Sequence, residues 1–226
     1  METIKNFNDW NFLGRMISSL QKDLVVAAAS KEKAGKWLSL SSSVIDYCNS
    51  HFMGEMAKYT EPALRITRYL RCNFFWITQN WMDLSKELEV SIKEEKAPIF
   101  YIIKGFFSLH YLANQSYFLI DKSLEASLFP ELKTKKRALR EAEECFNCAN
   151  SLIIHEKDKH LESTILWSKA WMLYKLNNKE LMNKYALRAW QLDGGNTGEG
   201  WNLWAQWLGR IIDPLENLIL MESIKK

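Results

Sequence analysis

AEECFNCA at residues 142–149 and MNKYALRA at residues 182–189 place a small or apolar residue at the first, fifth and eighth positions. Steps of four and then three residues put these side chains on one face of an α-helix. WSKAWMLY at 167–174 and WNLWAQWL at 201–208 each begin with tryptophan, 34 residues apart. The stretch 135–208 therefore predicts alternating helices that pack in pairs.

This stretch resembles the tetratricopeptide repeat, whose unit is a pair of antiparallel helices of 34 residues. The second-helix pattern of that family, alanine, aromatic, alanine, is present at Ala142, Phe146 and Ala149. Trp171 stands where the first helix of the family has a small residue, and roughly six extra residues near 155–160 lengthen the period. The resemblance covers about 134–211 and implies an irregular right-handed α-solenoid or helical-hairpin array.

Ala and aromatic residues at helical spacing also occur in an irregular helical bundle, so that fold stays open. In either case the class is all-α with about eight to nine helices. Residues 30–36 are expected as a turn, 90–97 as a hinge and 122–133 as a loop. The expected helices are 9–29, 37–48, 62–89, 98–121, 134–154, 159–176, one from 178 to near 192, 201–211 and 215–224.

The start of the third helix is predicted from Thr60-Glu61-Pro62, since a hydroxyl can cap a helix and proline suits its first turn. The segments 1–96 and 97–226 are expected as an N-terminal helical region and a repeat-like region of one continuous domain. With 47% hydrophobic residues and only four prolines, the chain can bury a full core in long helices.

Composition also limits the function classes. A formal net charge of +3 is too small to indicate nucleic-acid binding by itself. Residues 99–113 form the most apolar run, yet a membrane-spanning helix needs about 20 apolar residues, so no membrane span is expected. The N-terminus lacks the features of a secretory signal, which favours a cytoplasmic protein with reduced cysteines.

No known catalytic or cofactor motif occurs in the sequence. Cys145 and Cys148, with His155 and His160, suggest a metal set. Within one helix, however, Cys148 and His155 would lie about 10.5 Å apart along the axis, too far for one zinc ion. The glycine-rich segment 193–200 lacks the preceding strand and the lysine of a phosphate-binding loop. We therefore expect no metal, no cofactor and no enzyme activity.

Two basic clusters could contact an anion or a nucleic acid. The first lies at the start of the helix predicted at 134–154, and a solvated helix start balanced by glutamates is its simpler interpretation. The second falls on the side of the 62–89 helix opposite the apolar stripe that includes Ile66, as a solvated face would. The clusters are Lys135, Lys136, Arg137 and Arg140, and Arg65, Arg68 and Arg71.

Aromatic residues supply the other predicted binding surface. In the resembled family the first helices of the units line a groove, which implies partner contacts for Trp167, Trp171, Tyr174, Trp201 and Trp204. Core packing is the competing interpretation of these side chains. The sequence thus favours a non-catalytic interaction module or adaptor subunit that binds a protein or peptide. The alternative is a nucleic-acid-associated subunit of a larger complex that uses the basic clusters.

Overall fold

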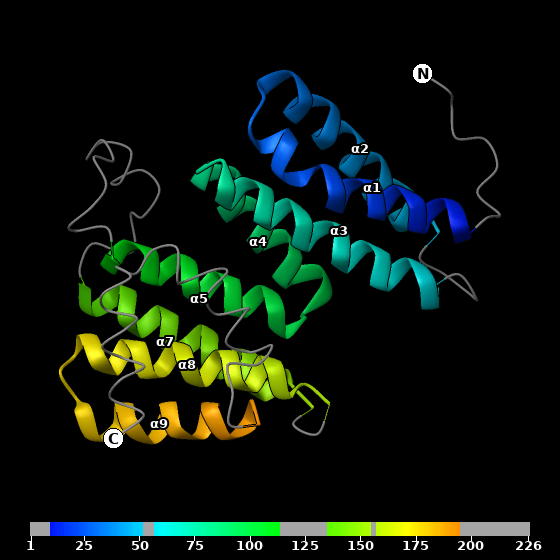
Figure 1. Cartoon of the computed structure of the whole chain (residues 1–226). Coiled ribbons are helices and arrows are strands. Elements are labelled where there is room, and N and C mark those ends of the chain that lie inside the picture. Colours follow the sequence, from blue (N-terminus) through cyan, green and yellow to red (C-terminus); the bar gives the residue numbers. More distant parts are fainter. Residues whose placement is uncertain (1–9, 52–56, 114–134, 155–156, 195–226) are drawn as a thin grey trace. The chain divides into compact units, whose positions relative to one another are not determined.

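A computed structural model describes residues 10–51, 57–113, 135–154 and 157–194 (Figure 1). These residues form eight α-helices and no strand, which confirms the all-α class for the part of the chain described. The chain divides between Glu95 and Lys96 into two compact units, one residue before the expected boundary. The right-handed solenoid and the repeat arrangement stay predictions.

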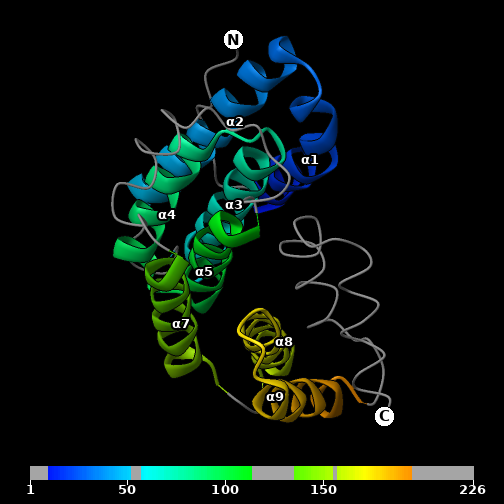
Figure 2. The same ribbon diagram turned by 90° about the vertical axis from the view of Figure 1, so that its left-hand side faces the viewer.

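In unit 1 the structure describes four helices, of which the first three pack against one another while the fourth packs along the third (Figure 2). The Trp37 ring stacks on Phe74 at 4.8 Å between centroids, and its indole N–H donates to the Leu20 carbonyl at 2.8 Å. One aromatic side chain therefore joins the first three helices. The helices are α1 (Trp10–Ala28), α2 (Lys31–Ser50), α3 (Ala57–Ile77) and α4 (Trp81–Glu95).

Two predicted helix starts in unit 1 are wrong. α2 begins at Lys31, so most of the expected 30–36 turn is helical, and a Glu32–Lys36 ion pair of 2.7 Å supports its first turns. α3 begins at Ala57, and Pro62 lies inside it. Pro62 has no backbone N–H to donate to the carbonyl four residues earlier, and Thr60 is buried inside the helix rather than capping its start.

The predicted helix over 62–89 is also wrong, because a short turn divides it into α3 and α4. Gln79 adopts a left-handed conformation with φ 55°, and the Asn80 backbone N–H donates to the Phe75 carbonyl at 2.8 Å. These are the features of a Schellman helix end. The Asn80 side chain then accepts from the Asp83 backbone N–H at 3.4 Å and starts α4.

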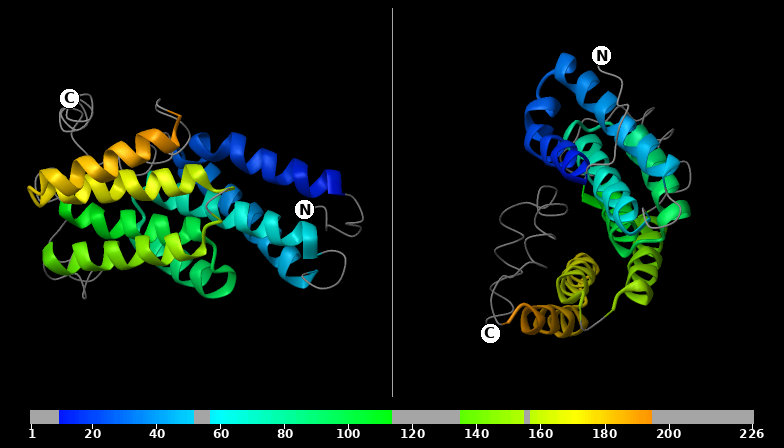
Figure 3. Two further views of the ribbon diagram at one scale, coloured as in Figure 1. Left: turned by 90° about the horizontal axis from the view of Figure 1, so that it is seen from below. Right: turned by 90° about the vertical axis from the view of Figure 1, so that its right-hand side faces the viewer.

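The described residues of unit 2 form two pairs of packed helices, as Figure 3 shows from two sides. α5 packs along α7, and α8 packs along α9. The bounds of α8 and α9 agree with the predicted helices over 159–176 and up to 192, and Asn177 forms the turn between them with φ 57°. The four helices are α5 (Pro98–Ala113), α7 (Lys135–Leu152), α8 (Lys159–Lys175) and α9 (Lys179–Leu192).

The α5–α7 pair depends on a missing side chain. A Cβ atom built on Gly105 of α5 would lie 2.5 Å from Cε1 of Phe146 on α7. The Phe146 ring is fully buried and packs edge to face on Phe106, with centroids 5.8 Å apart. Ala142 and Ala149 on the same face of α7 are also fully buried. Small residues therefore let the two backbones approach around one aromatic ring.

Replacement of Gly105 by alanine should destabilise unit 2 by about 1 to 3 kcal/mol, because the buried Phe146 ring has to move. The matched control is Gly35→Ala in α2, where the new methyl group meets no atom within 4 Å. That change should be neutral or stabilising by up to about 1 kcal/mol. Chemical denaturation followed by circular dichroism measures both, and equal effects would contradict the packing described.

Candidate functional site

A groove in unit 1 combines apolar and charged side chains. α2 and α4 each pack on α3, and the groove between them has a volume of about 460 Å³. This volume falls within the range of ligand sites in proteins. The residues that line it are Leu38, Ser42, Ile45 and Asp46 from α2, Arg68, Arg71 and Phe75 from α3, and Asp83, Lys86, Glu87 and Val90 from α4.

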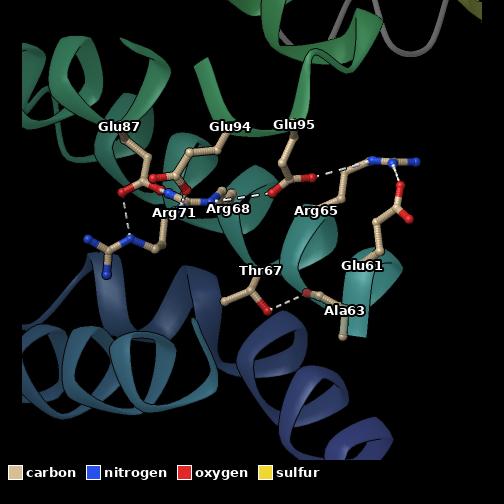
Figure 4. Close-up of polar contacts among 9 residues, drawn as sticks. All are labelled: Glu61, Ala63, Arg65, Thr67, Arg68, Arg71, Glu87, Glu94 and Glu95. Carbon is tan, nitrogen blue, oxygen red and sulfur yellow. Dashed lines mark hydrogen bonds and ion pairs between the residues drawn. The ribbon is translucent and has the colours of Figure 1, made fainter. Parts of the chain in front are cut away.

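The floor of the groove is held by Arg68, whose side chain is only 5% exposed. Its guanidinium lies 3.2 Å from a Glu87 oxygen and 3.3 Å from a Glu95 oxygen, and it also donates to Glu94 (Figure 4). All three carboxylates come from α4. Since an unpaired buried charge is strongly destabilising, these contacts fix α4 on α3.

Arg71 links the buried network to the groove. Its Nε donates to Glu87 at 2.8 Å, and its Nη1 donates to the hydroxyls of Ser41 and Ser42 at 2.9 and 3.2 Å. The guanidinium carbon lies 5.5 Å from the centre of the Phe75 ring, within the range of a cation–π contact. Arg71 is therefore held in one position by residues of α2, α3 and α4.

Arg65 completes the network on the more exposed side. It donates to Glu61 one helical turn away at 2.8 Å, and its Nε lies 3.5 Å from Glu95. The expectation of a solvated arginine face on α3 is therefore wrong: Arg68 is buried, whereas Ile66, expected in the apolar stripe, is 44% exposed. The reason is the turn at 78–80, which brings α4 back over the arginine side.

The ionic network contains one more carboxylate than it contains arginines, and we assign this excess to Glu95. Three guanidinium groups, those of Arg65, Arg68 and Arg71, face four carboxylates in the network. Burial raises the pKa of the Glu95 carboxyl to about 7, against the opposing effects of Arg68 and Arg65. Both of its oxygens are buried and lie at ion-pair distance from these arginines without hydrogen-bond geometry.

The elevated pKa of Glu95 predicts a specific pH dependence of stability. Between its ordinary pKa of 4.5 and about 7, the folded state binds more protons than the unfolded state. The free energy of unfolding should therefore fall as pH rises through this window, by about 2 to 3 kcal/mol from this group. In denaturant titrations at several pH values, Glu95→Gln should abolish this fall in the free energy of unfolding. Glu89→Gln, at an exposed side chain, should leave the fall unchanged. An unchanged slope in Glu95→Gln would contradict the assignment.

Removal of the Arg68 charge should lower the free energy of unfolding far more than removal of the neighbouring Arg65 charge. Arg68→Leu removes one of the two arginines that contact each of the buried Glu87 and Glu95 carboxylates, so we expect a loss of about 3 to 5 kcal/mol. Arg65→Leu affects a side chain that is 41% exposed and should cost about 1 kcal/mol or less. Urea unfolding of both variants tests this order, and similar losses would refute it.

The aromatic residues predicted to line a partner groove are placed differently by the structure. Trp167 and Trp171 are 0% and 1% exposed, which agrees with core packing and not with an open binding surface. The Trp167 indole donates to Asp193 at 3.1 Å and Tyr174 is half-buried. Trp201 and Trp204 lie outside the described residues.

The basic cluster of residues 135–140 lies at the start of α7, as predicted. Arg137 and Arg140 are exposed, and the side chains of Lys135 and Lys136 lie outside what the structure describes. Their contact with an anion or nucleic acid stays a prediction.

The cysteine pair of α7 is split between core and surface. Cys145 is buried, and its burial raises the pKa of the thiol to about 12, while Cys148 is exposed. Within the described part of the chain, no group of three or more possible metal ligands comes together. In the same residues, no helix has the length and apolarity needed to cross a bilayer.

Sequence reasoning singled out Arg68 and Arg71 but missed their partners. Glu87 was expected inside one long helix with them, where it would lie about 28 Å from Arg68 along the axis. The signal that could have found the site is Asn80, a residue type that begins helices and tolerates turns. With a helix end there, Glu87, Glu94 and Glu95 fall on a neighbouring helix.

Comparisons with known proteins found no relative of this chain. No family model matches the chain, and neither a curated protein nor a solved structure matches it.

Proposed function

We propose that the protein is a non-catalytic interaction module whose α2–α4 groove binds a peptide segment or a partner subunit. The observation that carries this proposal is the combination of apolar walls with a rigid ionic floor. Leu38 and Ile45 line one wall and Val90, 40% exposed, lines the other, while Arg71 is immobilised beneath them. Binding surfaces of this kind gain affinity because their polar groups are ordered before the partner arrives.

The proposed binding surface replaces the aromatic groove expected from the sequence. Trp167 and Trp171 have no exposed area to offer a partner, whereas the side chains of the unit 1 groove border open space. Arginine is also among the side chains that most often dominate binding energy at interfaces, and the Arg71 side chain is 17% exposed.

The nucleic-acid alternative has less support from the same residues. Arg65, Arg68 and Arg71 are surrounded by four carboxylates, and Asp46 and Asp83 line the groove as well. Phosphate groups would be repelled by these acids. Among the side chains of the basic cluster of residues 135–140 that the structure describes, Arg137 and Arg140 are exposed and keep the feature on which that alternative was based.

A pair of matched variants tests the proposed function. Val90→Asp places a charge on the groove wall, and Val25→Asp makes the same change on α1 at a side chain that is 68% exposed and does not line the groove. Quantitative affinity purification from an extract of the source cells should show partners retained by wild type and Val25→Asp but reduced at least tenfold for Val90→Asp. Identical partner sets for all three proteins would rule out the groove.

A further inference from the structure

The walls of the groove have the spacing of two helix faces. On α2 the lining residues follow steps of four, three and one, from Leu38 to Asp46, and on α4 they follow steps of three, one and three, from Asp83 to Val90. A third helix, α3, forms the floor between them. Ridges of side chains on two neighbouring helices create a channel into which the ridge of another helix fits. A helix is therefore the shape that suits this groove best.

The floor of the groove carries a positively charged group with unused hydrogen-bonding capacity. Nε and Nη1 of Arg71 are engaged with Glu87, Ser41 and Ser42. Its other amino nitrogen, Nη2, is not among the buried unsatisfied atoms and donates no hydrogen bond within the described residues. The side chain is 17% exposed. Nη2 is thus the donor left for a partner.

The neighbouring charges indicate what this donor would bind. The buried Arg68 is already held by three carboxylates, and Asp83 accepts from Asn80 at 2.7 Å and faces Lys86 at 3.8 Å. Lys86, with a highly exposed side chain, adds a second cation at the rim. A single carboxylate can reach the Arg71 donor between apolar contacts, whereas a polyanion would meet Asp46 and Glu87 along its length.

We propose that the groove binds an amphipathic helix of a partner protein and that one acidic side chain of this helix pairs with Arg71. The inference rests on the proposed interaction function and adds to it the class of partner and the residue that recognises it. The apolar stripe of the partner helix packs on Leu38, Ile45 and Val90. Its carboxylate accepts hydrogen bonds from Arg71, whose orientation is fixed by Glu87 and the two serines.

The experiment uses the full chain and a displayed library of helical peptides of about 18 residues, roughly five turns. The library has a fixed stripe of leucine and isoleucine, and each position beside the stripe varies among Glu, Gln, Lys and Ala. We expect enrichment of Glu at one position of the helices retained by wild type. Enrichment of Lys, or no retained helix at all, would overturn the proposal.

The selected helix is then synthesised with Glu or Gln at the enriched position and its affinity measured by fluorescence anisotropy. The Glu form should bind wild-type protein ten- to a hundredfold more tightly, as expected for a hydrogen bond between charged groups. In Arg71→Gln the two forms should bind alike, and in Arg71→Lys an intermediate preference should remain. A Glu preference that survives Arg71→Gln would refute the role of Arg71.

Two controls separate the failure of this inference from that of the proposed function. Circular dichroism shows whether each variant is folded, and Val90→Asp changes the groove wall while Glu87, Ser41 and Ser42, the partners of Arg71, stay in the sequence. One outcome is that peptides bind wild type but not Val90→Asp and show no preference for Glu over Gln. That result would support the groove as a binding site and refute only the recognition of an acidic side chain. Competition by a single-stranded DNA or RNA oligonucleotide would assign the groove to nucleic acid instead and overturn the inference.

Discussion

The burial of the Arg68 charge is the constraint on which unit 1 depends. A guanidinium group taken out of water is stable only beside opposite charges that satisfy it. The three carboxylates that do so come from α4, so α4 has to lie along the arginine side of α3. The Schellman turn at Gln79 and Asn80 makes that path possible. The groove between α2 and α4 is a result of this arrangement.

Unit 2 is held together by a different principle, the close approach of helices through small residues. Gly105, Ala142 and Ala149 leave the space that Phe146 fills. In the second helix pair, Asp193 at the end of α9 accepts hydrogen bonds from Ser163 and from Trp167 of α8. These contacts join the C-terminal end of α9 to the N-terminal half of α8.

Within the described residues, the sequence predicted the helix bounds of unit 2 better than those of unit 1. The helices of unit 2 have apolar residues at regular spacing, and the Asn177-Asn178 pair marks the turn between α8 and α9 openly. In unit 1 the equivalent turn begins with Gln79, a residue that rarely adopts positive φ, so the periodic pattern seemed continuous. One unrecognised turn then hid α4, which supplies at least one carboxylate partner to each of the three arginines. Side-chain periodicity alone cannot show which helix a second helix will cover.

Glu87 has a consequence for how this protein can change through evolution. It contacts the buried Arg68 with one oxygen and accepts from the groove-facing Arg71 with the other. A substitution that alters this carboxylate therefore perturbs the fold and the proposed recognition surface together. We expect the residues at positions 68, 71 and 87 to change together in related sequences. A new partner preference should therefore arise more readily through substitutions of wall residues, such as Ser42, Ile45 or Val90.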